Sequence, residues 1–238
     1  MTPENREQML RVLRDSLKSA NLPAATPEHP ASLVYSDERT AWSSGTDIDT
    51  LTMRFRKELD ALAGVTYPVE SVDEAAAQIA ELAQRFDTTR LLGWDAAAFE
   101  SIGVPGLIDR LTARGLSMVA QQVPFSGDAR RDCLTGLDPL PLGLTGADAG
   151  LAESGSIVLS SGPGRGRLAS LMVPVHIAVL RRDRMVFALS DLFRLRPDLA
   201  AMPGSNLVCI TGPSRTADIE MTLSRGVHGP REIHVILL

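Results

Sequence analysis

Residues 65–94 read VTYPVESVDEAAAQIAELAQRFDTTRLLGW, and this stretch decides the fold class. It opens on the strand-like run Val65-Thr66-Tyr67 and closes on a second apolar run at residues 90–94. Between them, Ser71 and Glu74 stand at the spacing of a capping box, which predicts the start of a helix. The helix is supported by a 3.6-residue apolar repeat in Ala75, Ile79, Leu82 and Phe86. Alternating strand and helix predict a largely parallel sheet with helices on its faces.

The same alternation extends along the chain in both directions. Residues 47–64 repeat apolar side chains at helical spacing and end at Gly64, and a helical pattern around Leu107 and Leu111 precedes a strand-like run at 117–120. Further strands are predicted at 157–159, 173–180, 206–210 and 233–238, and further helices at 190–193 and 216–223. We therefore expect one α/β domain over residues 47–238.

The first 46 residues differ from this pattern. Residues 3–19 predict an amphipathic helix with Thr2 as its cap and Pro3 at its first position. The connector at 21–46 has three prolines and little periodicity. We expect an N-terminal helical appendage that packs on the domain or on a partner.

Composition narrows the function classes. A net charge of −5 and a pI near 5.4 argue against a general nucleic-acid binder, and no apolar run is long enough to span a membrane. Cys133 and Cys209 have no Cys-x-x-Cys neighbour, and the histidines lack metal-site spacing, so we expect no thiolate cluster and no metal site in this chain. Without a signal-peptide pattern at Met1, the cytoplasm is the expected location.

Glu153 leads a first candidate site. It precedes Ser154, Gly155 and Ser156 at the entrance of a predicted strand, where it can act as an acid or base while the small residues let a substrate approach the backbone. The alternative is a turn in which Glu153 holds an amide or an arginine.

A glycine-rich turn follows that strand. Free backbone N–H groups and guanidinium groups make a sensible anion site, although the turn matches neither a Walker A loop nor Gly-x-Gly-x-x-Gly. The residues expected to bind a ligand here are Gly162, Gly164, Arg165, Gly166 and Arg167. The alternative is an ordinary surface turn.

Two further polar blocks lie near the C-terminus. In the block at 212–220, Ser214 or Thr216 is expected to cap the predicted helix, which leaves Arg215 for a carboxylate or phosphate ligand or for an acidic neighbour in its own helix. In the block at 226–231, His228 is a candidate for proton transfer or for a backbone hydrogen bond in a tight turn. His176, within an apolar strand, either lines a pocket or is a satisfied core histidine, and His234 is placed similarly.

The blocks at 144–155, 212–220 and 226–231, in this order, resemble the signature blocks of the LUD domain, the lactate-utilization protein C family. The resemblance implies a fold similar to that of ribose-5-phosphate isomerases and CoA transferases. It also implies participation with two partner proteins in the oxidation of L-lactate to pyruvate, with iron–sulfur clusters on a partner. The sequence itself has no recognisable cofactor fingerprint, so we expect no cofactor in this chain.

Three functional hypotheses follow. The first is a ligand-binding or accessory subunit of a lactate-oxidising complex, in which Arg215, the 162–167 turn and Glu153 surround one pocket for a small carboxylate or phosphate. The second is an autonomous sugar-phosphate isomerase or CoA-transferase-like enzyme that uses Glu153 as base or nucleophile. The third is a non-catalytic scaffold that docks an iron–sulfur partner through its N-terminal helix.

Overall fold

The computed structural model describes residues 47–119, 123–124, 126–201, 206–217, 223–226 and 228–238, together with Arg11. The chain divides into two units, Met1–Ala41 and Trp42–Leu238. The helix expected at 3–19 and the connector expected at 21–46 lie outside the described residues, except that Arg11 is helical.

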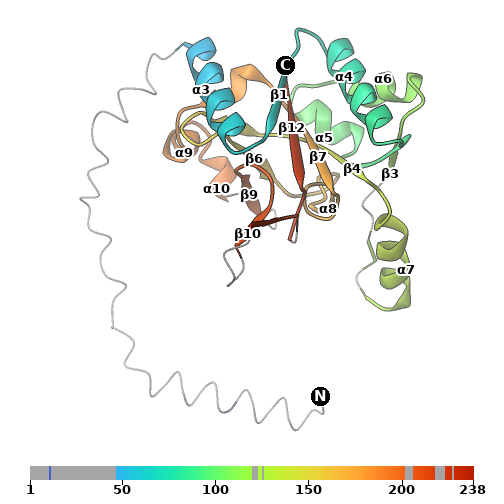
Figure 1. Ribbon diagram of the computed structural model, residues 1–238. Helices are drawn as coiled ribbons and strands as arrows, with labels where there is room; N and C mark the ends of the chain where they lie inside the picture. Colours follow the sequence, from blue (N-terminus) through green and yellow to red (C-terminus); the bar gives the residue numbers. More distant parts are fainter. Residues whose placement is uncertain are drawn as a thin grey trace. The chain divides into compact units, whose positions relative to one another are not determined.

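The centre of the second unit is a six-stranded sheet in the order β1-β12-β7-β4-β2-β3 (Figure 1). Every neighbouring pair in it is parallel, which confirms the predicted sheet type. Its strands are β1 (Val65–Pro68), β2 (Arg90–Gly93), β3 (Ser117–Val119), β4 (Leu142–Gly146), β7 (Val175–Leu180) and β12 (Glu232–Leu237). All residues of β4 and β7 are buried, as expected for interior strands of a parallel sheet.

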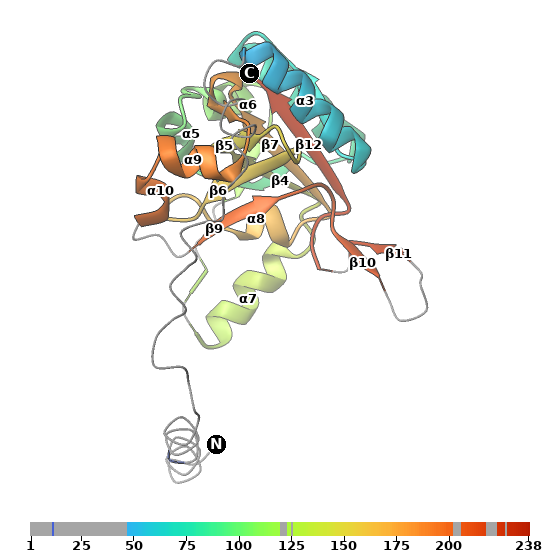
Figure 2. The same ribbon diagram turned by 90° about the vertical axis from the view of Figure 1, so that its left-hand side faces the viewer.

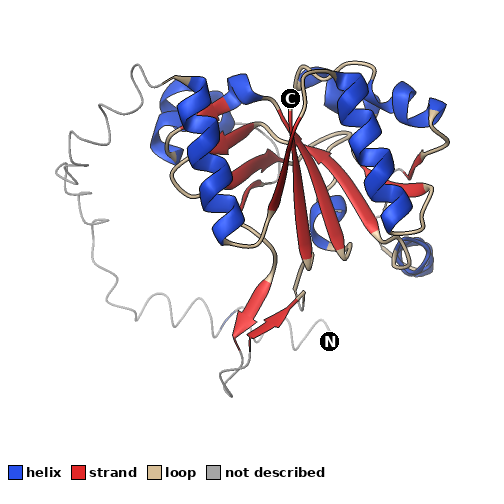
Figure 3. Ribbon diagram, turned by 45° about the horizontal axis from the view of Figure 1, so that its top comes forward, coloured by secondary structure: helices blue, strands red, loops and turns tan. Residues whose placement is uncertain are grey.

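Helices cover both faces of this sheet, as predicted, and two neighbouring residues of β2 show it. Leu91 belongs to the large core beneath α3, α4, α5 and α6, whereas Leu92 packs with Leu137 and Ala169 of α7 and α8. Successive residues of a strand point to opposite faces. The helices are α3 (Ile48–Ala61), α4 (Val72–Arg85), α5 (Ala96–Ser101), α6 (Leu107–Ala113), α7 (Asp128–Leu137) and α8 (Leu168–Leu171). Figure 3 shows the helices flanking the strands.

Local signals for helix ends were largely right. The backbone N–H of Glu74 donates to Ser71 Oγ at 3.2 Å, so Ser71 caps α4 as predicted. The return bond is shifted by one residue, because Glu74 Oε2 accepts from the N–H of Glu70 at 2.9 Å and not from Ser71. The helix α3 ends just before Gly64, with Ala63 in the left-handed region.

A second sheet of four strands, in the order β8-β5-β6-β9, lies apart from the first. Its strands are β5 (Ala149–Leu151), β6 (Ser156–Ser160), β8 (Met185–Val186) and β9 (Leu207–Ile210). The strands expected at 157–159 and 206–210 therefore exist, but β6 pairs antiparallel with both of its neighbours. A four-residue turn joins β5 to β6, and so short a connection permits only antiparallel pairing. The same part of the chain carries η1 (Arg182–Arg184), α9 (Leu189–Leu195) and α10 (Asp198–Ala201).

The helix expected at 216–223 is wrong. Residues on both sides of the undescribed stretch 218–222 form the antiparallel strands β10 (Arg215–Ala217) and β11 (Leu223–Arg225), which project from the sheets in Figure 2. The backbone of Ser214 is held by the second block, because its N–H donates to Pro230 O at 2.8 Å and its carbonyl accepts from Gly226 at 3.1 Å. Pairing with this later segment overrides the local capping signal of Ser214 and Thr216.

None of the helices in the described ranges combines the length and apolar composition needed to cross a bilayer.

Candidate functional site

The connectivity of the parallel sheet creates a crevice between β2 and β4. From β2 the chain continues to β3 on one side, whereas β4, the next strand of this sheet, lies on the other side and leads on to β7. Ligands of open α/β sheets bind where strand order reverses in this way, at the carboxyl ends of the strands. The residues after β2 and the loop before α8 lie at this point, since Asp95 N–H donates to Gly164 O at 3.1 Å.

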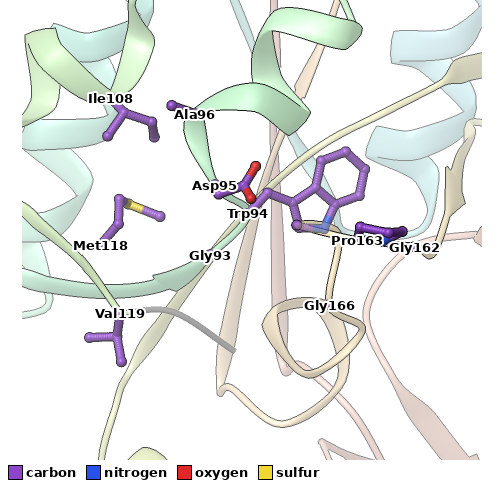
Figure 4. A pocket seen from close by; sticks show the side chains of 11 residues that line it. Gly93, Trp94, Asp95, Ala96, Ile108, Met118, Val119, Gly162, Pro163 and Gly166 are labelled. Atoms are coloured by element: carbon purple, nitrogen blue, oxygen red, sulfur yellow. The ribbon is translucent and has the colours of Figure 1, made fainter. Parts of the chain in front are cut away.

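A cavity of about 490 Å³ lies beside this point, at the carboxyl ends of β2 and β3 (Figure 4). One wall is apolar and consists of Ile108, Met118 and Val119. Gly93 at the end of β2 and the three residues after it form the middle, and the glycine-rich loop 162–166 forms the other side. The predicted residues Gly162, Gly164 and Gly166 therefore line a cavity, together with the carboxylate of Asp95.

Gly164 is required by the close approach of the loop to Asp95. Its φ is +71°, and a Cβ on it would lie 2.3 Å from Asp95 Oδ2. Asp95 is itself fixed, because its Oδ1 accepts from the N–H of Ala98 at 2.8 Å and caps α5. A glycine is therefore needed at 164 for both steric and conformational reasons.

Arg165 anchors the loop from behind. Its Nη1 donates to Asp148 Oδ1 at 2.8 Å and to Ser160 Oγ at 2.7 Å, and its Nη2 donates to Ser101 Oγ at 2.6 Å. The guanidinium carbon lies 5.0 Å from the centre of the Trp94 ring. Asp148 also accepts from the N–H and Oγ of Ser160, at 2.6 and 2.7 Å. Arg165 thus balances the charge of Asp148 and holds the loop, instead of offering a free guanidinium to an anion.

The loop also has donors that no described acceptor takes. In the part of the chain that the structure describes, no acceptor takes the backbone N–H of Gly164, Gly166 or Arg167, and no carboxylate pairs with the exposed Arg167 guanidinium. Unpaired N–H groups in a glycine turn, followed in the sequence by the cation of Arg167, suit an anionic group.

Glu153 lies at the other end of β6. It follows β5 in the turn before β6, where its N–H donates to Phe187 O at 2.9 Å, whereas Ser160 ends β6 and the glycine-rich loop follows it. The five residues of β6 separate the two ends by about 14 Å. Glu153 is not among the residues that line the cavity.

The neighbours of Glu153 make contacts within the protein. Ser154 Oγ lies 2.7 Å from Ser156 Oγ, which lies 2.6 Å from Thr211 Oγ1. A Cβ on Gly155, whose φ is +64°, would lie 2.4 Å from the backbone nitrogen of Leu59 in α3. The small residue therefore admits a helix rather than a substrate.

The block at 212–216 sits against the end of α3. Arg215 Nη2 donates to the carbonyl of Leu62, the C-cap of that helix, and a Cβ on Gly212 would lie 2.9 Å from Leu62 Cβ. Ser214 bonds through its backbone to the block at 226–231, and Thr216 faces Ser224 across the ribbon. The structure thus brings the two C-terminal blocks together, but not to the cavity that Gly162, Gly164 and Gly166 line.

His228 borders a second, smaller cavity of about 200 Å³. Gly226, Gly229 and Arg231 line it together with the connection from α8 to β7. Arg231 N–H donates to Pro174 O at 2.7 Å, which places this cavity at the amino ends of β7 and β12. His228 is exposed and lies at the sheet edge opposite to the larger cavity.

The two strand histidines are core residues. His176 is fully buried, with its Nε2 2.8 Å from Thr145 Oγ1 and its Nδ1 without a hydrogen-bond partner among the described residues. Burial, and to a smaller extent His234, lower the pKa of His176 to about 3. His234 lies between Tyr67 Oη and Glu232 Oε2, each at 3.1 Å, and burial lowers its pKa despite the opposing effect of Glu232.

Sequence reasoning missed Asp95, Trp94 and Asp148. Asp95 had a detectable signal, since an aspartate after a strand and before three alanines is a typical N-cap. Asp148 lies inside a glycine-rich block of the sequence. Its ion pair with Arg165 depends on the fold and has no signal in the sequence. Among the described residues, no three His, Cys, Asp or Glu side chains are grouped so that they could hold a metal ion.

Comparisons with known proteins agree with this fold. Residues 52–238 match the family model described as the LUD domain. A "Lactate utilization protein C" of Halalkalibacterium halodurans is 32% identical over 164 residues, 67% of this chain and 66% of the relative. One from Exiguobacterium sp. is 42% identical over 102 residues, 41% of this chain and 44% of the relative. The matched stretches thus span less than two thirds of these two relatives.

Two further matches cover nearly the whole of the related chain. A "Lactate utilization protein C" of Bacillus pumilus is 27% identical over 248 residues, 99% of this chain and 98% of the relative. The crystal structure of a DUF162 family protein from Deinococcus radiodurans superposes with a TM-score of 0.54 at 22% identity, covering 81% of this chain and 99% of that one. That likeness supports the fold. Since the family model matches most of its length, the chain belongs to the LUD domain family.

Proposed function

We propose that the chain takes part in lactate utilization as a ligand-binding component, with the cavity at the carboxyl ends of β2 and β3 as its binding site. The metabolic role is supported by relatives named lactate utilization protein C, one of which aligns over almost the whole chain. The cytoplasm is the location that we expect for this role.

The observation that carries the binding site is a cavity whose walls are held open by specific contacts. The carboxylate of Asp95 lies against Gly164, a position where a Cβ would not fit. Arg165 fixes the same loop through its ion pair with Asp148. Asp148 is almost fully buried, with 4% of its side chain exposed, so this ion pair is part of the structure and not a surface contact. Several specific contacts that fix one loop are expected where that loop positions a ligand.

Oxidation of L-lactate to pyruvate removes a hydrogen pair, which an acceptor must take up. We propose that a partner subunit with iron–sulfur clusters carries the electrons and that this chain binds and positions a ligand. For an autonomous enzyme, Asp95 is a better placed acid or base than Glu153, because Asp95 lines the cavity.

The test uses two alanines at the start of α5. Ala96 and Ala97 are both exposed, but only Ala96 lines the cavity. In the source organism with its own gene deleted, we expect growth on L-lactate as sole carbon source to be lost, to be restored by the Ala97→Trp variant, and not to be restored by Ala96→Trp.

Growth on glucose is the control for general fitness, and far-UV circular dichroism checks that both variants fold. Unchanged growth on L-lactate after deletion contradicts the metabolic role. Equal rescue by both variants contradicts the assignment of the binding site.

A further inference from the structure

The cavity at the carboxyl ends of β2 and β3 has three chemically different parts in a row. Figure 4 shows Ile108, Met118 and Val119 on one side, Asp95 in the middle, and the loop of Gly162 and Gly166 on the other side. The first part is apolar, the second offers a carboxylate, and the third offers backbone N–H groups beside Arg167.

The size of the cavity exceeds the needs of a three-carbon acid. Its volume of about 490 Å³ falls within the range of about 300–1,000 Å³ that is typical of sites for cofactors and drug-sized ligands. Lactate or pyruvate would leave the apolar wall in contact with water only. A ligand that fills the cavity must therefore carry an apolar part as well as polar groups.

Each part of the cavity selects one chemical group. The half-buried side chains of Ile108, Met118 and Val119 suit a flat apolar ring. Asp95 Oδ1 is occupied by the N-cap bond, so its Oδ2 is the oxygen that can accept from a ligand hydroxyl. The unpaired N–H groups of Gly164 and Gly166 suit phosphate oxygens.

We propose that this cavity binds a nucleoside phosphate, with the base on the apolar wall, a sugar hydroxyl donating to Asp95, and the phosphate on the N–H groups of loop 162–166 near Arg167. This inference rests on the proposed function, which assigns the cavity as the binding site. A carboxylate after a strand at the switch point and a glycine turn for phosphate are also the two polar elements by which other open α/β sheets hold nucleotides.

Isothermal titration calorimetry of the full chain with ADP tests the proposal, and adenosine and D-ribose 5-phosphate each remove one of the three contacts. We expect ADP to bind, and each of the smaller compounds to bind at least about tenfold more weakly. No heat with millimolar ADP, or equal affinity for ADP and D-ribose 5-phosphate, overturns the proposal.

The variant Asp95→Asn separates the role of the carboxylate from simple repulsion. Asparagine can still cap α5, so the fold is retained. If Asp95 accepts a hydroxyl, the Kd of ADP rises about tenfold. If the carboxylate only repels phosphate, the Kd falls, and the assignment of the sugar is wrong. Asp109→Asn, an exposed carboxylate on α6, is the charge-matched control and leaves the Kd unchanged.

The pair of tryptophan variants locates the site. Ala96→Trp is expected to abolish ADP binding and Ala97→Trp to preserve it. If both variants lose ADP binding, or if both retain it, the nucleotide does not bind in this cavity. This inference and the proposed function fail separately. Binding of L-lactate but not of ADP, together with the growth defect of Ala96→Trp, contradicts the nucleotide and keeps the proposed function.

Discussion

Replacing Arg165 by leucine tests whether the loop that borders the cavity is held by a buried ion pair. The change removes the hydrogen bonds that Arg165 donates to Asp148, Ser160 and Ser101, at 2.8, 2.7 and 2.6 Å. It leaves the Asp148 carboxylate, with 4% of its side chain exposed, without a cation. We expect the protein to fold but with a clearly lower free energy of unfolding.

The magnitude follows from burial. Breaking a buried ion pair by removing one partner costs about 3–5 kcal/mol. Ser160 still donates to Asp148 through its N–H and Oγ, and 14% of the Arg165 side chain is exposed, so the lower end of this range applies, about 3 kcal/mol. Adding Asp148→Asn removes the isolated charge, and the double variant should recover about 1–2 kcal/mol of that loss.

Urea unfolding followed by far-UV circular dichroism measures both effects, provided that the m value is unchanged. Arg131→Leu is the control, because Arg131 and Asp128 form an ion pair with 78% and 88% of their side chains exposed, which contributes less than about 1 kcal/mol. If Arg165→Leu costs no more than Arg131→Leu, or if Asp148→Asn adds to the loss, the ion pair does not hold the loop.

Three further predictions concern single residues. Burial lowers the pKa of His176 from 6.5 to about 3, so between these pH values only the unfolded chain binds a proton at this histidine. The free energy of unfolding should therefore be highest above pH 6.5 and should fall towards pH 3 by up to about 1.4 kcal/mol per pH unit. The fall should be shallower in the His176→Gln variant. Gly164→Ala should lower the free energy of unfolding, measured by heat or urea, by at least about 1–2 kcal/mol, because Gly164 has a positive φ and lies against the carboxylate of Asp95. Gly162→Ala, which has open space around its Cβ, should be nearly neutral. Equal effects of the two variants contradict the steric argument. Arg215→Met should lower the free energy of unfolding by less than about 1 kcal/mol and leave growth on L-lactate intact, since this exposed side chain donates a hydrogen bond to a helix carbonyl. A growth defect in a variant of unchanged stability would instead indicate that Arg215 belongs to the binding site.

Most elements of the fold were predictable because their signals are local. The apolar repeat and the Ser71 cap of α4 lie within one helix, and the strands β2, β7 and β12 are rich in apolar residues. The helix expected at 216–223 was wrong, because the backbone of Ser214 pairs with a later segment. A capping signal indicates which secondary structure a segment can form in isolation. It does not indicate which other segment of the chain will pair with that segment in the fold.

The candidate site was predictable only in part. The glycines of loop 162–166 indicated close approach of the backbone, and the structure confirms that Gly164 is forced by its neighbour. Which neighbour that is, Asp95, depends on the order of strands in the sheet. Arg165 was expected to bind an anion, and the anion that it meets in the structure is the protein's own Asp148.

The sequence alone determined the types of the main elements, the parallel sheet and the family, because periodicity, caps and ordered polar blocks are properties of neighbouring residues. Only the tertiary structure decided which polar groups share a cavity. It separated Glu153, Arg215 and His228 from the glycine-rich loop and placed Asp95 beside it. The physical reason is that strand order and strand direction set which loop ends meet at a sheet edge, and neither is encoded in the spacing of residues within a segment.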